Sequence, residues 1–214
     1  MGIPVGILGS GAVAKALGAG FIKHGYEVML GTTNPTKLDA WKEQTSGHTG
    51  TFEEAAKFGQ IIVLAVKGHA AVDVLKAGGI DNLKGKIVID TNNPIDDKNP
   101  PVNGVLNFFT GPNESLMEQL QVAAPEANFV KAFNSIGSGF MVNPPFAEKP
   151  AMFICGNSDS AKAEVTTILD LFGFEVQDMG KAEAARAIEP LCTLWCIPGF
   201  LHNQWSHAFR LIKL

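Results

Sequence analysis

The sequence lacks the features that mark membrane-spanning, secreted and nucleic-acid-binding proteins. Its 214 residues include only three cysteines, an odd number in no disulfide-rich pattern, which favours a reducing cytoplasm. No apolar run reaches transmembrane length and no basic segment precedes the first apolar stretch, so we expect neither a membrane partner nor a secretory signal. The formal net charge is -4 and like charges form no run, so we expect no nucleic-acid partner.

The sequence does contain the balance of an ordinary globular protein, with 46% hydrophobic and 18% charged residues. Short apolar runs typical of buried strands alternate with stretches in which apolar residues recur at helical spacing. The strand-like runs are PVGILGSG, YEVML, QIIVLAV, KIVIDTNNP, ANFVKAFN, PAMFICG and FEVQDMG. Helices are expected over 12–25, 35–41, 51–59, 69–77, 114–123, 158–173 and most of 181–214. This alternation predicts an α/β protein, a doubly wound parallel sheet with helices on both faces.

The segment between the first strand and the first helix has a pattern that binds dinucleotides. Residues 9–14 fit G-x-G-x-x-G/A, and they follow a strand and open a helix, as the mechanism requires. Gly9 allows the tight turn, Gly11 lets a pyrophosphate approach the backbone, and Ala14 is small enough for close packing of helix on strand. The helix amino terminus then offers free N–H groups to the phosphates. An ordinary tight turn is the structural alternative, but this context favours a dinucleotide.

The position at which an NAD-selective site carries an acid holds two threonines instead. Counting about 20 residues from the glycine turn leads to Thr32 and Thr33. A carboxylate there would repel a 2′-phosphate, whereas two hydroxyls, Asn34, a proline-led helix start and Lys37 would accept one. The same residues can cap a helix, and capping is compatible with phosphate binding. The sequence therefore predicts NADP rather than NAD. Because no arginine stands in this segment, we expect the 2′-phosphate to be bound less selectively than an arginine would bind it.

A set of motifs spans nearly the whole chain: VGILGSGAVAKAL with a following strand and G-x-x-N-P, then VIDTNNP, VKAFNSIG, FICGNSDSAKA and ARAIEPLCTLWCIPG. With these motifs the sequence resembles a known family, the NADP oxidoreductases that use coenzyme F420, a deazaflavin. The same amino-terminal pattern occurs in the soluble domain of the membrane metalloreductases. The resemblance implies hydride transfer between NADP and a flavin-like or deazaflavin ring. It also implies an NADP-binding Rossmann domain, here 1–147, and a small carboxy-terminal part, 148–214, usually in a dimer.

The resemblance also implies where the cofactor binds. The pyrophosphate contacts map onto 10–13, and the 2′-phosphate contacts map onto Thr32, Thr33 and Lys37, where the family commonly has Ser-Arg in place of the two threonines. The end of the third predicted strand would lie along the path from adenosine to nicotinamide. The complete set of expected cofactor contacts is Gly9, Ser10, Gly11, Ala12, Val13, Thr32, Thr33, Asn34, Lys37, Ala65, Val66, Lys67, His69, Asn92, Asn93 and Pro94.

Asparagines at two strand ends are candidates for orienting the nicotinamide or the substrate. One strand ends in Asn92, Asn93 and Pro94, and another ends in Asn134. An asparagine amide can hold a nicotinamide carboxamide or a substrate carbonyl, although asparagine also favours turns. Asn134 precedes a glycine-rich loop and is the stronger candidate for an orienting catalytic residue. Hydride transfer needs little other side-chain chemistry, because the cofactor carries the reaction.

The loop 135–145 is expected to receive the acceptor ring, because ligands bind beyond the carboxyl ends of the strands. Its apolar walls would be Ile136, Phe140 and Met141. A basic rim for an anionic acceptor tail is sparse, with Lys149, Lys181 and Arg186 as its candidates. A surface loop is the structural alternative.

Two pairs of residues near the carboxyl terminus, one of cysteines and one of charged residues, can each have a structural or a functional role. Cys192 and Cys196 share a helical face, but no further ligands stand at a recognised spacing, so we expect buried thiols and no metal site. Arg186 and Glu189 either contact substrate or form a structural ion pair.

The last segment is unusually apolar, which predicts that part of it packs on a second subunit in a homodimer. Its apolar residues are Leu191, Leu194, Trp195, Ile197, Phe200, Leu201, Trp205, Phe209, Leu211 and Ile212.

Three functions remain open. The first is an NADP-dependent oxidoreductase acting on coenzyme F420 or on FMN or FAD as substrate. The second is an NADPH-dependent reductase of a small carbonyl or imine, for which only Lys67, His69 and asparagines stand at the strand ends as proton donors. The third is a non-catalytic NADP-binding regulatory protein.

Overall fold

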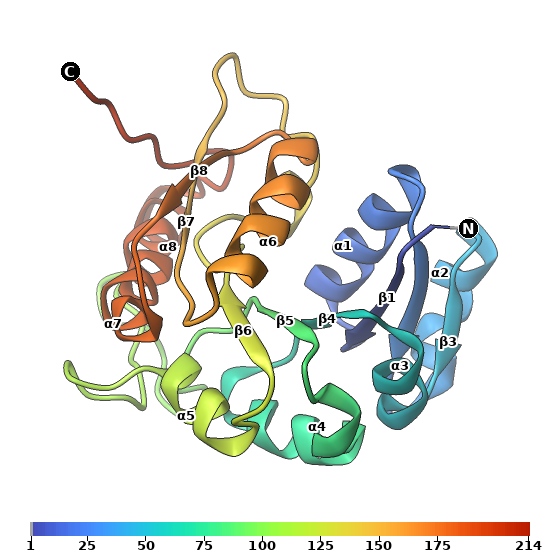
Figure 1. The fold of residues 1–214 in the computed structure, drawn as a ribbon. Coiled ribbons are helices and arrows are strands. Elements are labelled where there is room, and N and C mark those ends of the chain that lie inside the picture. The colour runs from blue at the N-terminus through green and yellow to red at the C-terminus, as the bar shows by residue number, and fades with distance from the viewer. Residues whose placement is uncertain (1) are drawn as a thin grey trace.

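A six-stranded parallel sheet forms the centre of the molecule (Figure 1). The computed structural model describes residues 2–214. The strands are β1 (Pro4–Leu8), β2 (Glu27–Gly31), β3 (His48–Gly50), β4 (Ile61–Leu64), β5 (Ile87–Asp90) and β6 (Asn128–Lys131). Their order, β3-β2-β1-β4-β5-β6, is that of a Rossmann sheet, which confirms the predicted fold class.

Helices connect the strands and cover both faces of the sheet. They are α1 (Ala12–Lys23), α2 (Asp39–Gln44), α3 (Phe52–Phe58), α4 (Ala71–Gly78), α5 (Leu116–Ala123), α6 (Asp159–Leu171), α7 (Ala185–Ile188) and α8 (Pro190–His202). Short 3₁₀ turns lie at Pro35–Leu38, Gly68–Ala70, Ile80–Leu83, Ser138–Phe140 and Ala182–Ala184. The predicted cap of α3 is present, because Thr51 Oγ1 accepts from Glu54 N at 3.1 Å and Glu54 Oε2 accepts from Thr51 N at 2.7 Å.

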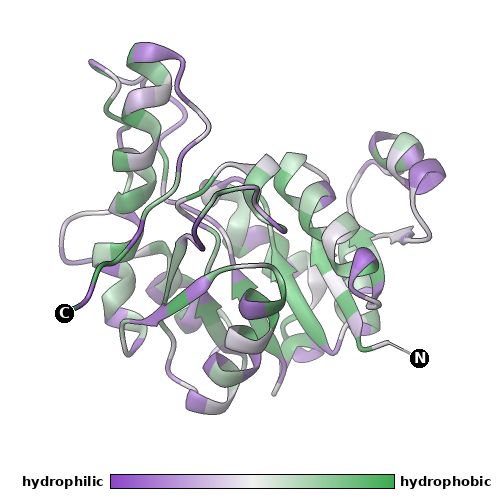
Figure 2. Ribbon diagram, turned by 90° about the horizontal axis from the view of Figure 1, so that it is seen from above, coloured by the Kyte–Doolittle hydropathy of each residue, from purple (hydrophilic) through white to green (hydrophobic). Residues whose placement is uncertain are grey.

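Two separate cores result from the alternation of side chains along the strands. In β1, Ile7 points to the face covered by α1 and α6, whereas Leu8 points to the face covered by α3, α4 and α5 (Figure 1). Strand β4 is buried on both faces, as its continuous apolar run predicts. Figure 2 accordingly shows the central strands coloured mostly as hydrophobic, while the outer helices alternate between the two colours.

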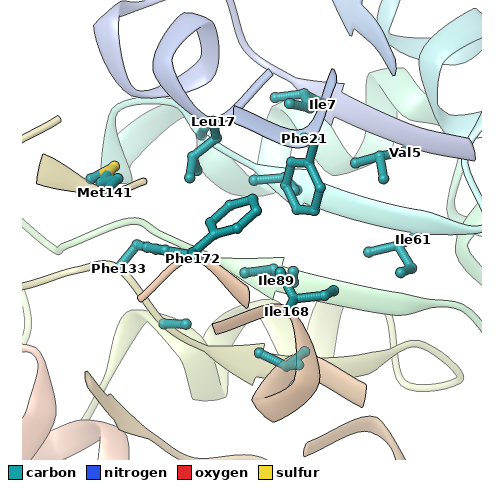
Figure 3. Packing of buried hydrophobic residues seen from close by; sticks show 14 of the residues in the cluster. Val5, Ile7, Leu17, Phe21, Ile61, Ile89, Phe133, Met141, Ile168 and Phe172 are labelled. Atoms are coloured by element: carbon teal, nitrogen blue, oxygen red, sulfur yellow. The ribbon is translucent and has the colours of Figure 1, made fainter. Parts of the chain in front are cut away.

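Phe172 joins α6 to α1 within the first core. Its ring is fully buried, with its centroid 4.9 Å from that of Phe21 and 6.1 Å from that of Phe133 (Figure 3). Side chains from both helices and from the sheet surround these rings, so this cluster fixes α6 over the sheet.

A second, two-stranded sheet follows the first. It pairs β7 (Ala151–Ile154) with β8 (Glu175–Asp178) in parallel, with α6 as the crossover, as the sequence predicts. An isolated antiparallel bridge joins it to the main sheet, where Lys131 N donates to Cys155 O at 3.0 Å. The expected domain boundary between residues 147 and 148 falls in the irregular segment before β7, and the division into two domains stays a prediction.

The structure corrects three local expectations. Strand β3 was not predicted, because three residues without an apolar run give no periodic signal. The helix expected over 35–41 is a 3₁₀ turn followed by α2, and Asn34 makes no side-chain cap; its Oδ1 instead accepts from Thr36 Oγ1 at 2.7 Å. Residues 203–214 are not helical, because α8 ends where Asn203 adopts a left-handed conformation with φ of 54°.

Among the helices within residues 2–214, none is both long enough and apolar enough to span a bilayer.

Candidate functional site

A pocket of about 450 Å³ opens at the carboxyl ends of β1, β4 and β5. It lies where the crossover connections change direction between β1 and β4, which is where ligands bind in sheets of this kind. Its lining residues are Ser10, Gly11, Ala12, Val13, Ala65, Val66, Lys67, Gly68, Thr91, Asn92, Asn93, Ile95 and Asp97. Nine of the expected cofactor contacts are therefore brought together here; Gly9, Thr32, Thr33, Asn34, Lys37, His69 and Pro94 lie outside the lining, as does Asn134.

The glycine turn forms one wall of the pocket. Gly9 has φ of 153°, and a Cβ at this position would lie 2.1 Å from the Ala65 carbonyl oxygen, so a side chain is excluded. Gly11 is the N-cap of α1 and faces open space, with no atom within 4 Å of a Cβ built on it. The first turn of α1 carries no acid and no side-chain cap, so its backbone N–H groups are available to an anion.

The Thr32 side chain is buried and forms a hydrogen bond with the glycine turn. It is 4% exposed, and its Oγ1 donates to Ser10 Oγ at 3.2 Å while accepting from Asn34 N at 3.1 Å. Thr33, Asn34 and Lys37 are exposed beside it, after the end of β2. The four residues expected around a 2′-phosphate are therefore adjacent, with one hydroxyl buried and three side chains open to solvent.

An ion pair crosses the mouth of the pocket. Lys67 Nζ lies 2.8 Å from Asp97 Oδ2, and His69 Nδ1 lies 3.5 Å from the same oxygen. Sequence analysis missed Asp97, because the irregular segment that holds it has no periodicity. The available signal was its place three residues after the Asn-Asn-Pro turn.

The two candidate asparagines meet at the inner end of the pocket. Asn93 Nδ2 donates to Asn134 O at 2.9 Å, and Asn134 Nδ2 donates to Asn93 Oδ1 at 3.2 Å and to Ile188 O at 2.9 Å. Asn134 is 4% exposed, so it supports Asn93 from behind the pocket wall. Asn92 has a structural contact as well, because its Oδ1 accepts from Val66 N at 2.9 Å. An orienting role for Asn134 stays a prediction.

A buried cluster of charges lies behind the same wall. We call Lys131, Asp90 and Glu189 the Lys131 cluster. Lys131 Nζ lies 2.6 Å from Asp90 Oδ2 and 2.8 Å from Glu189 Oε1, and all three side chains are at most 2% exposed. Burial alone would lower the pKa of Lys131, but the two carboxylates outweigh it and raise that pKa above its ordinary value.

Glu189 has a second role as a helix cap. Its Oε2 and Oε1 accept from Leu116 N and Met117 N, each at 3.0 Å, at the amino terminus of α5. Arg186 and Glu189 therefore do not form an ion pair with each other, because each has another partner, and a substrate contact by either stays a prediction. Arg186 binds Glu118, with Nη2 2.6 Å from Glu118 Oε1.

The cysteines of α8 lie on the side of the helix that faces the core. Cys192 is buried and Cys196 is half-buried. A hydrogen bond that Cys192 donates to Cys196, together with burial, raises the pKa of Cys192, and accepting the same bond lowers the pKa of Cys196. Among residues 2–214 no three metal-ligating side chains of His, Cys, Asp or Glu converge.

Comparison with known proteins gives a family match and relatives among the metalloreductases. Residues 4–94 match the family described as NADP oxidoreductase, coenzyme F420-dependent. Metalloreductase STEAP3 of Rattus norvegicus is 30% identical over 201 residues, which cover 92% of this chain and 38% of that protein. Metalloreductase STEAP2 of Homo sapiens is 28% identical over 197 residues, 90% of this chain and 37% of that protein. The chain thus spans less than two fifths of the length of these relatives.

Solved structures extend the comparison to the whole chain. A crystal structure described as an F420-dependent NADP reductase from Arthrobacter sp. FB24 superposes with a TM-score of 0.93 at 29% identity, covering 99% of this chain and 100% of that one. A reductive aminase from Aspergillus terreus superposes with a TM-score of 0.69 at 18% identity, covering 95% and 64%, and shares the fold alone. The resemblance noted from the motifs is confirmed, and the matched family and the superposed reductase both agree with the predicted class of oxidoreductase.

The Lys131 cluster leads to a prediction about stability. Lys131→Met should lower the free energy of unfolding by about 3–5 kcal/mol, because it leaves two buried carboxylates without their cation. Lys84→Met is the matched control, since it removes an exposed partner of Glu126 and should leave the urea midpoint nearly unchanged. Equal midpoints for the two variants would contradict the assignment.

Proposed function

We propose, on the premise that residues 4–94 belong to the coenzyme F420-dependent NADP oxidoreductase family, that this chain transfers a hydride between NADP(H) and a flavin-type or deazaflavin ring. The observation that carries the proposal is the glycine turn. Its open N-cap at Gly11 and the uncapped N–H groups of α1 face the pocket, where they fit the pyrophosphate of a dinucleotide. The bound nicotinamide would supply the hydride chemistry, and the chain would orient it and exclude water.

The surroundings of Thr32 support NADP rather than NAD. No Asp or Glu occurs between Gly31 and Leu38, so nothing there repels a 2′-phosphate. Thr33, Asn34 and Lys37 are exposed and can turn toward a phosphate, while the Thr32–Ser10 hydrogen bond links this patch to the glycine turn. Because the patch holds one lysine and no arginine, we expect a moderate preference.

This proposal predicts the cofactor preference. NADPH should bind more tightly than NADH, and Thr33→Asp should reverse the order, because a carboxylate repels the 2′-phosphate and can accept from a ribose hydroxyl. Titration calorimetry with both nucleotides measures the effect. Thr167→Asp, which adds the same charge at an exposed position of α6, is the control and should leave the order unchanged. Tighter NADH binding by the wild-type protein would contradict the assignment.

The residues around Asn93 support a planar acceptor ring, and they offer few charges with which to select an anionic acceptor over a neutral one. Of the three expected walls, Ile136 and Met141 are 7% and 3% exposed and belong to the core, so only half-buried Phe140 can stack on a ring. Of the expected basic rim, Arg186 is neutralised by Glu118. An anionic tail would therefore gain little, and we propose only modest discrimination between deazaflavin and ordinary flavin.

A second candidate function is the reduction of a small carbonyl or imine. The group formed by Lys67, Asp97 and His69 favours it, because an ammonium and an imidazole that share one carboxylate could donate the proton that such a product needs.

Stopped-flow mixing separates these candidates. NADPH should reduce coenzyme F420 and FMN at rates that differ modestly, and any advantage of the anionic coenzyme should shrink at high salt. Reduction of an imine or aldehyde while both rings stay oxidised would favour the second candidate. Tight NADPH binding without turnover of any acceptor would leave a regulatory, non-catalytic protein.

We also propose a homodimer that buries part of α8 and the residues after it. Leu194 and Leu201 are 55% and 51% exposed and lie seven residues apart, on one side of the helix. Residues 203–214 add further exposed apolar side chains, with Ile212 at 83%. A group of exposed apolar side chains of this kind is typical of a surface that packs on another subunit.

Light scattering tests the assembly. The wild-type protein should be a dimer at micromolar concentration, and Leu194→Glu should shift it toward monomer, because it would bury a charge in the interface. Val122→Glu alters another strongly exposed apolar residue, on α5, and should stay dimeric. A monomeric wild-type protein would remove the proposal.

A further inference from the structure

The Lys131 cluster is adjacent to the pocket through the backbone. Asp90 is the last residue of β5, and the residues after it, 91–93, line the pocket. Lys131 Nζ also donates to the Asn92 carbonyl oxygen at 2.8 Å. The charged groups of the cluster thus lie directly behind the pocket-lining residues 91–93 and are shielded from solvent. Charges interact more strongly there than in water, because the interior has a low dielectric constant.

Donors and the Lys131 ammonium surround both carboxyls of the cluster. Asp90 Oδ1 accepts from Asn92 N at 3.0 Å and from Asn92 Nδ2 at 2.9 Å, and its Oδ2 faces the Lys131 ammonium. Both oxygens of Glu189 accept from backbone N–H groups of α5, and one also faces Lys131. Within residues 2–214 every recorded polar contact of these four oxygens is with a donor, which leaves a carboxyl proton no acceptor.

The cluster therefore has a surplus charge. Two carboxylates oppose one ammonium, which leaves a net charge of one negative unit. The neighbouring thiols of Cys155 and Cys192 add no charge at neutral pH, because burial raises the pKa of Cys155 to about 12, and a hydrogen bond to Cys196 together with burial raises the pKa of Cys192. The N–H groups of α5 and of Asn92 offset the charge only partly, since they contribute dipoles rather than a cation.

We propose that this surplus charge favours the oxidised nicotinamide over the reduced one in the pocket. The inference rests on the proposed function. When the reduced ring gives up a hydride, two electrons and one proton leave together for the acceptor, and the ring changes from neutral to a cation. A buried negative charge stabilises the cation and makes the bound reduced cofactor a stronger hydride donor. Asp90 and Glu189 would act through this field, without touching the ring.

Separate affinities for NADP⁺ and NADPH test the inference. Glu189→Gln keeps the size of the side chain and removes one unit of charge. The ratio of the NADPH Kd to the NADP⁺ Kd should then fall by about tenfold, because the lost charge attracted only the oxidised, cationic ring. A merely structural role would change both affinities together and leave the ratio constant.

Glu118→Gln is the matched control. It makes the same chemical change at a carboxylate that is 25% exposed, where solvent screens the charge, so the ratio should stay within twofold of wild type. Thermal melting confirms that each variant is folded. If Glu189→Gln does not fold, Asp90→Asn removes the same charge from the other end of the cluster and should shift the ratio in the same direction.

The possible failures are distinguishable. If the wild-type protein binds neither nucleotide, the proposed function is wrong. If it binds both and the folded variants keep the wild-type ratio, only the inference about charge is wrong. If neither variant folds, the wild type decides alone: NADP⁺ binding more tightly than NADPH would support the inference, and NADPH binding equally or more tightly would overturn it.

Discussion

The Lys131 ammonium and its two carboxylates join three separate parts of the chain in the interior. Asp90 comes from β5, Lys131 from β6 and Glu189 from the residue between α7 and α8, and Glu189 also caps α5. An unpaired ammonium in this interior would be several kcal/mol unfavourable, so the three side chains can be buried only together. The position of the carboxy-terminal helices relative to the sheet edge therefore depends on this cluster, and so does the support that Ile188 gives to Asn134.

The pocket itself is shaped by backbone rather than by side chains. A Cβ on Gly9 would lie 2.1 Å from the Ala65 carbonyl oxygen, and a Cβ on Gly68 would lie 2.1 Å from that of Asn93. The three loops that follow β1, β4 and β5 therefore pack against each other at distances that only glycine allows. The consequence is a rigid wall of main-chain groups, which suits a cofactor that is held largely by N–H donors.

Local signals in the sequence were sufficient for much of this architecture. The alternation of strands and helices, the Thr51 cap and the glycine turn each depend on residues close together in the chain, and each was predicted. Strand β3 and the pairing of Glu189 with Lys131 depend on contacts between distant segments, and no local pattern encodes them. One signal was nevertheless available: Lys131 stands in an apolar strand, where an unpaired lysine would not be buried, so a carboxylate partner could have been sought.

A buried ion cluster is a poor way to gain stability alone, since apolar side chains of similar volume would often serve as well. What charged side chains add is a field, and here it acts on a pocket whose proposed reaction creates a cation. The same field opposes negative charge on the acceptor, because a ring that receives a hydride becomes an anion unless it also gains a proton. Lys67 and His69 sit on Asp97 at the mouth of that pocket and could supply the proton. The negative charge of the Lys131 cluster thus favours loss of the hydride from the cofactor, and the donors at the mouth of the pocket favour delivery of the proton to the acceptor.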